Sequence, residues 1–369
     1  MNDVDCMVVG AGVIGLAVGR ELAHRGRQVI ILEQERRIGL HTSSRNSEVV
    51  HAGIYYPANS LKARLCVAGR ELLHRYCIER NIPLRTCGKF IVATSNGQIS
   101  ELHALELRAK NNGVSDLEWQ DGAQAARDEP ALVCAAALWS PSTSVIDSQA
   151  YLLSLLADAE SYGAEIAYGS AVSSLRPTTQ GIEVCINDEA APVARAKILV
   201  NCAGLDAHRV AASIAGFPAT HIPRIHFAKG NYFALAGAAP FRRLIYPVPD
   251  AGGLGIHMCI DLNGRARFGP DVEWVQARDY AVDATRDKVF IDAIRHYWPN
   301  ISSQTLTPAY AGIRATLSGP GRPPADFLLS GPSQHGVAGV LNLFGIDSPG
   351  LTASLALATQ VAEMATAAL

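Results

Sequence analysis

Apolar residues near the N-terminus predict a strand, a helix and a second strand in close succession. Residues 4–9 are rich in valine and alternate little, which is typical of a strand buried on both faces. Residues 16–25 carry apolar side chains at helical spacing, and Gly26 is placed to end that helix. Residues 28–32 repeat the buried-strand pattern and lead to Glu33. This order is that of a βαβ unit.

Helical and strand patterns continue to alternate further along the chain. From about residue 220 to 310 the sequence pattern changes to short apolar runs that contain prolines and glycines and are expected to be strands. One helix is expected near 284–297. The other expected elements are helices over residues 60–80, 100–111 and 147–162, the last capped by Asp147 or Ser148, buried strands over residues 88–94, 197–203 and 340–344, and a terminal helix.

These patterns predict two domains built from non-contiguous segments. The expected fold class is an α/β, Rossmann-like, nucleotide-binding domain with an inserted α+β domain that is mostly antiparallel. The predicted nucleotide-binding domain comprises residues 1–85, 145–218 and 310–369, and the predicted second domain comprises residues 86–144 and 219–309.

Three glycines between the first strand and the first helix form a dinucleotide fingerprint. Gly10 permits a tight turn, Gly12 lets the backbone approach a pyrophosphate, and Gly15 lets helix and strand pack closely. Glu33 follows at the end of the next strand, where a carboxylate accepts hydrogen bonds from ribose hydroxyls. This motif alone fits NAD and FAD equally well.

The C-terminal segment favours FAD. The stretch "GIDSPGLTASLAL" places a helix near Ser348 and Pro349, directly after a buried strand and Gly345. A helix N-terminus there can stabilise negative charge on a reduced flavin, an element that NAD enzymes do not need. No second G-x-G-x-x-G motif occurs in the chain, so electrons are expected to come from an organic substrate and not from NAD(P)H.

Composition and charge exclude several other classes. Hydrophobic residues make up 49% and charged residues 18% of the 369, as in a soluble globular enzyme, and the net charge of -2 provides no basic field for nucleic acid. The eight cysteines form no C-x-x-C pair, which argues against a zinc site and a disulfide framework, and no metal site is expected. Because the N-terminal apolar run opens with acidic residues and is short, we expect no signal peptide, no transmembrane segment and a cytoplasmic location.

Motifs spread over nearly the whole chain resemble the D-amino-acid-oxidase-like superfamily, and more narrowly the L-2-hydroxyglutarate dehydrogenase/oxidase family. Besides the glycines and Glu33, the motifs are "TSSRNSEVVHAGIYY", "LKARLCVAGRELL", "CGKFIVAT", "LVNCAGL", "KGNYFAL", "LIYPVPD" with "GLGIH", and "YAGIR". The resemblance implies that the nucleotide-binding domain is an FAD-binding domain and the second domain a substrate domain, and that a small 2-hydroxy acid is oxidised by hydride transfer to flavin N5. It also implies a quinone, another acceptor or oxygen as the electron acceptor, and leaves peripheral contact with the inner membrane open.

Some positions depart from the family pattern. Glu48 stands where the family usually has glycine, and a carboxylate there would repel a dianion if it points toward the substrate. The alternatives therefore stay open. They are an amine or amino-acid oxidase of the glycine, sarcosine or D-amino-acid type, a glycerol-3-phosphate-like dehydrogenase, and a flavin-binding module that is not an enzyme.

Several side chains are candidates for the chemistry. His51 is the expected base for the hydroxyl proton, with a structural hydrogen bond as the alternative. Arg314 matches the geometry of a substrate carboxylate. The further candidates for substrate contacts are Tyr56, Tyr246, Lys229 and His257.

A larger set is expected to hold the cofactor through the glycine turn, the loop after Glu33, a central strand end and the C-terminal turn. These residues are Gly10, Gly12, Val13, Ile14, Gly15, Glu33, Gln34, Thr42, Ser43, Ser44, Arg45, Asn46, Ser47, Val172, Cys202, Ala203, Gly204, Gly312, Arg314, Gly345, Ile346, Asp347, Ser348, Gly350, Leu351 and Thr352. Cys66 and Cys202 are expected to be packing residues and not covalent flavin attachments.

Overall fold

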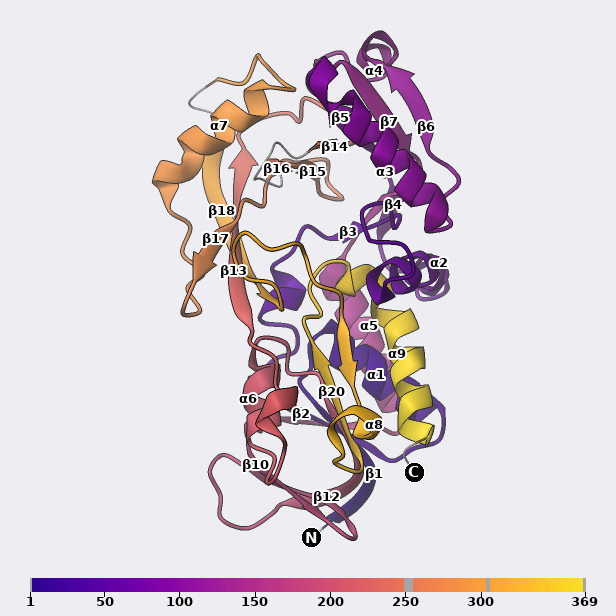
Figure 1. The fold of residues 1–369 in the computed structure, drawn as a ribbon, viewed down its shortest axis with the longest axis vertical. Helices are drawn as coiled ribbons and strands as arrows, with labels where there is room; N and C mark the ends of the chain where they lie inside the picture. Colours follow the sequence, from indigo (N-terminus) through magenta and orange to yellow (C-terminus); the bar gives the residue numbers. More distant parts are fainter. Residues whose placement is uncertain (1, 249–254, 303–305, 368–369) are drawn as a thin grey trace. The chain divides into compact units, whose positions relative to one another are not determined.

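The structure is a computed structural model that describes residues 2–248, 255–302 and 306–367. The chain forms two compact units, and each is described by itself (Figure 1). Unit 1 comprises Met1–Ser44, Ser148–Phe227 and Arg314–Leu369, and unit 2 comprises Arg45–Asp147 and Ala228–Ile313.

Unit 1 is an α/β layer structure around a central sheet of eight strands within the described residues. Its helices are α1 (Val13–His24), α5 (Ser148–Ser161), α6 (Ala207–Ala212), α8 (Pro332–His335) and α9 (Gly350–Ala367). Its strands are β1 (Asn2–Val9), β2 (Val29–Glu33), β9 (Glu165–Tyr168), β10 (Val172–Thr178), β11 (Gly181–Ile186), β12 (Ala194–Asn201), β19 (Leu328–Ser330) and β20 (Val340–Phe344).

The central strands of unit 1 are parallel, as the βαβ pattern predicted. β1 pairs with β2 and β12, β2 with β9, and β12 with β20, all in parallel, whereas the β10–β11 hairpin and β19 are antiparallel additions. Helix α1 packs against α5 and α9, and α6 lies on the other side of the sheet (Figure 1). Gly26, with φ of 79°, ends α1 as predicted, because its amide donates to the Ala23 carbonyl.

Unit 2 contains a mixed sheet of nine strands and a small sheet of three, counted over the described residues. Its helices are α2 (Leu61–Glu79), α3 (Ile99–Asn111), α4 (Gly122–Asp128) and α7 (Asp287–Arg295). The large sheet has the order β17-β13-β16-β15-β14-β5-β7-β6, with β18 beside β13, and the small sheet has the order β3-β8-β4. The strands are β3 (Val49–Val50), β4 (Leu84–Thr86), β5 (Lys89–Ala93), β6 (Glu118–Asp121), β7 (Ala136–Ser140), β8 (Ser144–Ile146), β13 (His226–Leu235), β14 (Leu244–Pro247), β15 (Met258–Ile260), β16 (Ala266–Phe268), β17 (Glu273–Val275) and β18 (Leu306–Thr316).

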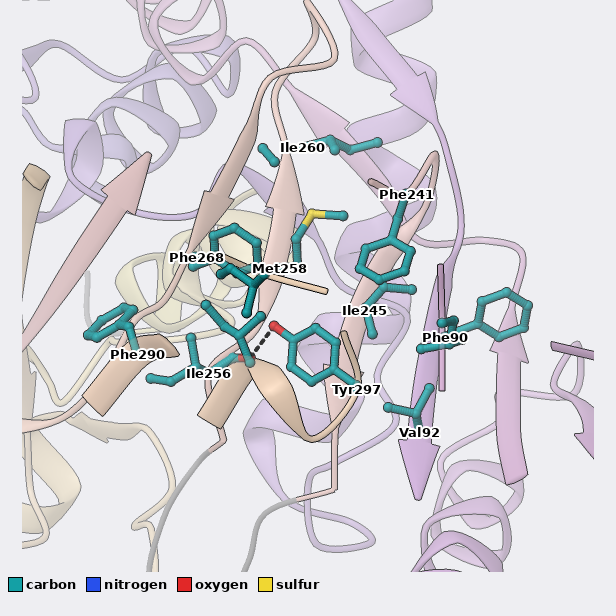
Figure 2. Close-up of a cluster of buried hydrophobic side chains, with 14 of the residues drawn as sticks. Phe90, Val92, Phe241, Ile245, Ile256, Met258, Ile260, Phe268, Phe290 and Tyr297 are labelled. Atoms are coloured by element: carbon teal, nitrogen blue, oxygen red, sulfur yellow. Dashed lines mark hydrogen bonds between the residues drawn. The ribbon is translucent and has the colours of Figure 1, made fainter. Parts of the chain in front are cut away.

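One face of the large sheet is covered by α7 and buries a continuous apolar cluster. Phe90, Ile245, Met258 and Phe268 point from four neighbouring strands into this cluster, and Phe290 joins it from α7 (Figure 2). The buried hydroxyl of Tyr297 donates to the Ile256 carbonyl at 2.9 Å, so the hydroxyl does not lie unsatisfied in the core. The alternation of strand side chains sends the intervening residues to the opposite face.

The compact units differ from the predicted domains mainly at residues 45–85, which pack with unit 2 and not with unit 1. Both β3 and β4 pair with β8, so two short strands tie this segment to the segment before residue 147. From α2, Arg70 donates to Ser142 Oγ at 2.9 Å and His74 Nε2 lies 3.1 Å from Ser144 Oγ. These contacts join residues that are distant in sequence, which helical periodicity does not reveal.

Most predicted elements occur within a few residues of their predicted ends. Several elements have no counterpart in the sequence predictions: β3 and β4, and the elements over residues 112–146, 163–193, 207–212 and 328–335, which are β6, α4, β7, β8, β9, β10, β11, α6, β19 and α8. Most side chains of β9 and β10 are exposed or half-buried, so these strands lack the apolar run that marks a buried strand. No helix in the described part of the chain is both long and apolar enough to cross a membrane.

Candidate functional site

The glycine turn of unit 1 leaves room for backbone only. Gly10 has φ of 100°, and a Cβ added there would lie 2.8 Å from the Cys202 carbonyl oxygen. A Cβ on Gly15 would lie 1.8 Å from the Gly10 carbonyl oxygen. The first turn of α1 therefore packs directly against the strand end, as the fingerprint predicted.

Two side chains hold the amides at the start of α1. Glu33, which is 7% exposed, accepts from the Ala11 amide at 2.7 Å through one carboxylate oxygen and from the Glu35 amide at 2.9 Å through the other. Ser43 Oγ accepts from the Val13 amide at 2.9 Å. Each carboxylate oxygen retains a second acceptor site, so Glu33 can still bind a ribose hydroxyl.

The C-terminal turn lies beside this first turn. Gly345 has φ of 67° and follows β20, and α9 begins at Gly350. A Cβ added to Gly350 would lie 3.2 Å from Ile346 Cγ2 and 4.0 Å from Ile14 Cδ1. The N-termini of α1 and α9 are therefore neighbours, and two helix N-termini favour a negatively charged ligand. This cradle fits the pyrophosphate and flavin of FAD.

The other predicted cofactor residues of unit 1 lie around the same strand ends or next to them. Cys202 follows β12, and its amide donates to the Val9 carbonyl at 2.9 Å. Burial raises the pKa of its thiol, which disfavours the thiolate that a covalent flavin bond would need. Gln34 Nε2 lies 3.5 Å from an Asp206 carboxylate oxygen, Ala203 and Gly204 follow Cys202, and Val172 begins β10.

The predicted cofactor loop, residues 42–47, divides between the two units. Thr42, Ser43 and Ser44 form a short 3-10 helix in unit 1. The next three residues have partners within unit 2. The Arg45 guanidinium lies 4.3 Å from the Tyr280 ring centroid, the Asn46 carbonyl accepts from the Tyr310 hydroxyl at 2.7 Å, and Ser47 Oγ lies 2.8 Å from the Tyr232 hydroxyl. Gly312 is also in unit 2, where a Cβ on it would lie 2.0 Å from the Arg45 carbonyl oxygen.

In unit 2, polar side chains lie on the face of the large sheet opposite the apolar cluster that α7 covers. Strand register sets this arrangement. Lys89 aligns with Leu244 on the neighbouring strand, and Tyr246 lies on the same face because it is two residues further along. Cys259 aligns in the same way with Arg267. The ring of Tyr246 stacks on that of His257 with centroids 3.7 Å apart, and its hydroxyl lies 3.5 Å from Cys259 Sγ. We call Tyr55, Lys89, Tyr246, His257 and Cys259 the Lys89 cluster.

Lys89 is the principal charge of this cluster and has no exposed surface. Its ammonium lies 4.8 Å from the ring centroids of both Tyr55 and Tyr246. Among the described residues, Nζ has no hydrogen-bond partner. Burial lowers the pKa of Lys89 to about 8, and cation–π contacts compensate only part of the desolvation cost.

His51 is held neutral by its surroundings. Its carbonyl is 3.5 Å from Cys66 Sγ, whose pKa burial raises to about 12. Burial, assisted by the charges of Lys89 and His257, lowers the pKa of His51 to about 3. The imidazole is therefore neutral, but so low a pKa makes it a weak proton acceptor near neutral pH, so the predicted role as base requires that substrate binding raise this pKa.

Glu48, the departure from the family pattern, is paired with a cation of the same unit. Its carboxylate lies 3.2 Å from Arg267 Nη2, and Arg267 Nη1 lies 3.3 Å from the Tyr310 hydroxyl. The pairing offsets the charge of Glu48, so the repulsion of a dianion considered from the sequence is reduced. Glu48 has φ of 57°, which explains why glycine suits this position.

The remaining predicted substrate-contact residues are Arg314, Tyr56 and Lys229, which are not members of the Lys89 cluster. Arg314 is a half-buried residue of β18 in unit 1, and the Tyr56 carbonyl accepts from Asn112 Nδ2 at 2.9 Å. Lys229 is 3% exposed and forms ion pairs with Asp279 at 3.2 Å and Glu273 at 3.8 Å. Its charge is therefore already compensated inside unit 2.

Three residues of the Lys89 cluster, namely Tyr55, Lys89 and Cys259, were not selected from the sequence. Tyr55, and not its predicted neighbour Tyr56, lies against the Lys89 ammonium. Lys89 stands at the head of the apolar run "KFIVA". A lysine in a strand that reads as fully buried is a signal that could have identified it, because lysine is almost never fully buried without a partner.

Comparison with known proteins gives consistent family and fold matches. The family model described as FAD dependent oxidoreductase matches residues 5–364. The chain is 43% identical to an Arabidopsis thaliana protein named "L-2-hydroxyglutarate dehydrogenase, mitochondrial", over 98% of this chain and 83% of that protein. A Mus musculus protein of the same name is 30% identical over 97% of this chain and 87% of its own length.

Solved structures share the fold at lower identity. L-alpha-glycerophosphate oxidase from Mycoplasma pneumoniae, with FAD bound, superposes with a TM-score of 0.90 at 22% identity, covering 99% of this chain and 95% of that one. Glycine oxidase from Geobacillus kaustophilus superposes with a TM-score of 0.84 at 21% identity, covering 100% and 96%. At these identities the likeness concerns the fold alone.

Proposed function

The chain belongs to the family of FAD-dependent oxidoreductases, and from that premise we propose that it oxidises L-2-hydroxyglutarate, or a close 2-hydroxy acid, to the 2-oxo acid. The observation that carries the proposal is the 43% identity, over nearly the whole chain, to a protein named for that substrate. In this proposal unit 1 binds FAD, and unit 2 supplies most of the residues that bind the substrate.

The cofactor-binding role rests on the cradle of unit 1. Gly10, Gly12 and Gly15 would let the pyrophosphate approach the backbone, Glu33 would accept from the ribose, and the α9 N-terminus would stabilise charge on the flavin. FAD supplies a two-electron acceptor for the hydride from C2 of the hydroxy acid. The proposed electron acceptor is a quinone, another acceptor or oxygen.

Residues of the chain have to accept the hydroxyl proton and bind the substrate carboxylates. Oxidation of a secondary alcohol releases the hydroxyl proton as the hydride leaves C2, so an unprotonated base must be present. His51 is our choice, because it lies in the family-like segment and its imidazole is unprotonated, although its low pKa has to rise when substrate binds. Arg314 is proposed to bind one substrate carboxylate through its planar guanidinium. Tyr246 and His257 would border the site as a stacked pair.

An anaerobic substrate panel tests this proposal. Purified, FAD-loaded protein is mixed separately with L-2-hydroxyglutarate, D-2-hydroxyglutarate, glycine, sarcosine and glycerol 3-phosphate, and the flavin absorbance is followed. We expect only the L-2-hydroxy acid to bleach it. If an amino acid or glycerol 3-phosphate bleaches the flavin while L-2-hydroxyglutarate does not, the proposed function is wrong. If no compound does, the flavin-binding module becomes the better description.

A further inference from the structure

Lys89 is a buried cation whose presence the fold itself does not explain. Taking an ammonium out of water costs several kcal/mol unless it is paired and hydrogen-bonded. Other buried or half-buried cations of unit 2 have such partners: Lys229 pairs with Asp279, and Arg267 pairs with Glu48. Lys89 has two aromatic rings beside it but, within the described residues, no hydrogen-bond acceptor for Nζ.

The position of Lys89 relates it to the proposed chemistry. It lies on the polar face of the sheet, next to Tyr246, which stacks on His257. Its charge is close enough to influence His51, the proposed base. In a 2-hydroxy acid, one carboxylate is attached to the same carbon that carries the hydroxyl. A cation near the proposed base, such as the Lys89 ammonium, could therefore bind that carboxylate beside the reacting carbon.

We propose that Lys89 is a substrate-binding residue whose ammonium pairs with the carboxylate next to the reacting carbon. This inference rests on the proposed function for the identity of the substrate. The desolvation free energy of the buried Lys89 ammonium is then offset by its ion pair with the substrate carboxylate.

Binding has a consequence for the base. Burial opposes protonation of His51 most strongly, and the charges of Lys89 and His257 add to this effect while the site holds no anion. A carboxylate beside Lys89 would compensate that charge, so the imidazole of His51 would become more basic when substrate is present. Through Lys89, binding of the substrate would thereby raise the pKa of His51.

The test measures binding of 2-oxoglutarate, which keeps both carboxylates, to the oxidised FAD-loaded protein by calorimetry. At pH 7 we expect Lys89→Met to raise Kd about 100-fold, in the range for removal of one partner of a buried charge pair. Lys89→Arg, which keeps the charge, should lose about tenfold or less. Lys110→Met, which removes an exposed lysine of α3 in the same unit, should stay within about twofold of wild type.

The wild-type protein supplies a test that needs no substitution. Because the pKa of Lys89 is lowered to about 8, the ammonium is mostly charged at pH 7 and mostly neutral at pH 9.5. Kd should rise roughly 30-fold over that interval, and Lys89→Arg should remove most of this rise. A role in folding alone would predict the opposite pattern, with a lower melting temperature for Lys89→Met and unchanged binding.

The outcomes separate the inference from the proposed function. Wild-type Kd in Lys89→Met, or a wild-type Kd that is flat from pH 7 to pH 9.5, overturns the inference even if L-2-hydroxyglutarate bleaches the flavin. If wild type neither binds 2-oxoglutarate nor is bleached by L-2-hydroxyglutarate, the proposed function is overturned. Loss of binding in Lys89→Met, with its FAD content and melting temperature retained, supports Lys89 as the substrate cation.

Discussion

Glu48 allows backbone strain and an ion pair to be tested at one position. Its φ of 57° is a left-handed conformation in which an L side chain costs about 1–2 kcal/mol. The backbone is fixed there by local and distant hydrogen bonds. The Glu48 amide donates to Asn46 Oδ1 at 2.8 Å, and the Glu48 carbonyl accepts from the Ile146 amide at 3.0 Å. The chain therefore cannot relax simply by changing φ.

The pair with Arg267 opposes this cost. The two side chains are 27% and 23% exposed, so we assign the pair about 1 kcal/mol, the upper end for surface pairs. Glu48→Ala removes the pair and keeps the strain, so the protein should lose about 1 kcal/mol. Glu48→Gly removes both, so its stability should be near that of wild type. Glycine should thus be more stable than alanine by about 1 kcal/mol, which reverses their usual order.

Differential scanning calorimetry of the FAD-loaded proteins measures this difference. For a domain of this size, about 1 kcal/mol corresponds to roughly 2–4 °C in melting temperature. Glu48→Gln is the matched control, because it keeps the side-chain length and the strained backbone but removes the charge. A double-mutant cycle with Arg267→Met isolates the pair energy. If Glu48→Ala melts at or above Glu48→Gly, the assignment of strain to this position is wrong.

Four further predictions concern the cofactor and the base. Gly15→Ala should purify without flavin absorbance, because its Cβ would lie 1.8 Å from the Gly10 carbonyl oxygen. Gly97→Ala, whose Cβ would lie 3.8 Å from Ser95 Oγ at ordinary contact distance, should keep FAD, and a yellow Gly15→Ala protein would contradict the packing of the turn. Acid precipitation should release all flavin into the supernatant, since the buried Cys202 thiol has a raised pKa, and flavin retained in the pellet would show a covalent bond. His51→Asn should slow anaerobic flavin reduction by about 10²–10⁴-fold, and a rate near wild type would exclude His51 as the base. His51 also predicts a pH effect on stability: its pKa is about 3 in the folded protein against an ordinary 6.5, so the folded state binds fewer protons in that interval. The melting temperature should therefore fall as pH drops below about 6.5, and less steeply in His51→Asn.

Local sequence patterns determined much of unit 1. The βαβ unit, the helix end at Gly26 and the close approach at Gly15 depend on neighbouring residues, on their period and on backbone freedom at glycine. The C-terminal turn and its helix were found for the same reason. The family resemblance extended this to the cofactor, because its motifs occur over nearly the whole chain.

The tertiary structure decided which side chains meet in unit 2. Strand register, and not sequence spacing, places Lys89, Tyr246 and Arg267 on one face of the sheet. The tertiary fold also brings Tyr55, from a loop, beside the lysine in place of Tyr56, and it pairs Glu48 with a residue more than two hundred positions away. A charge in the sequence does not state its partner, because ion pairs and burial depend on contacts between distant segments. The sequence by itself therefore determined the family, the cofactor and the glycine cradle, whereas only the fold showed which buried cation lacks a partner.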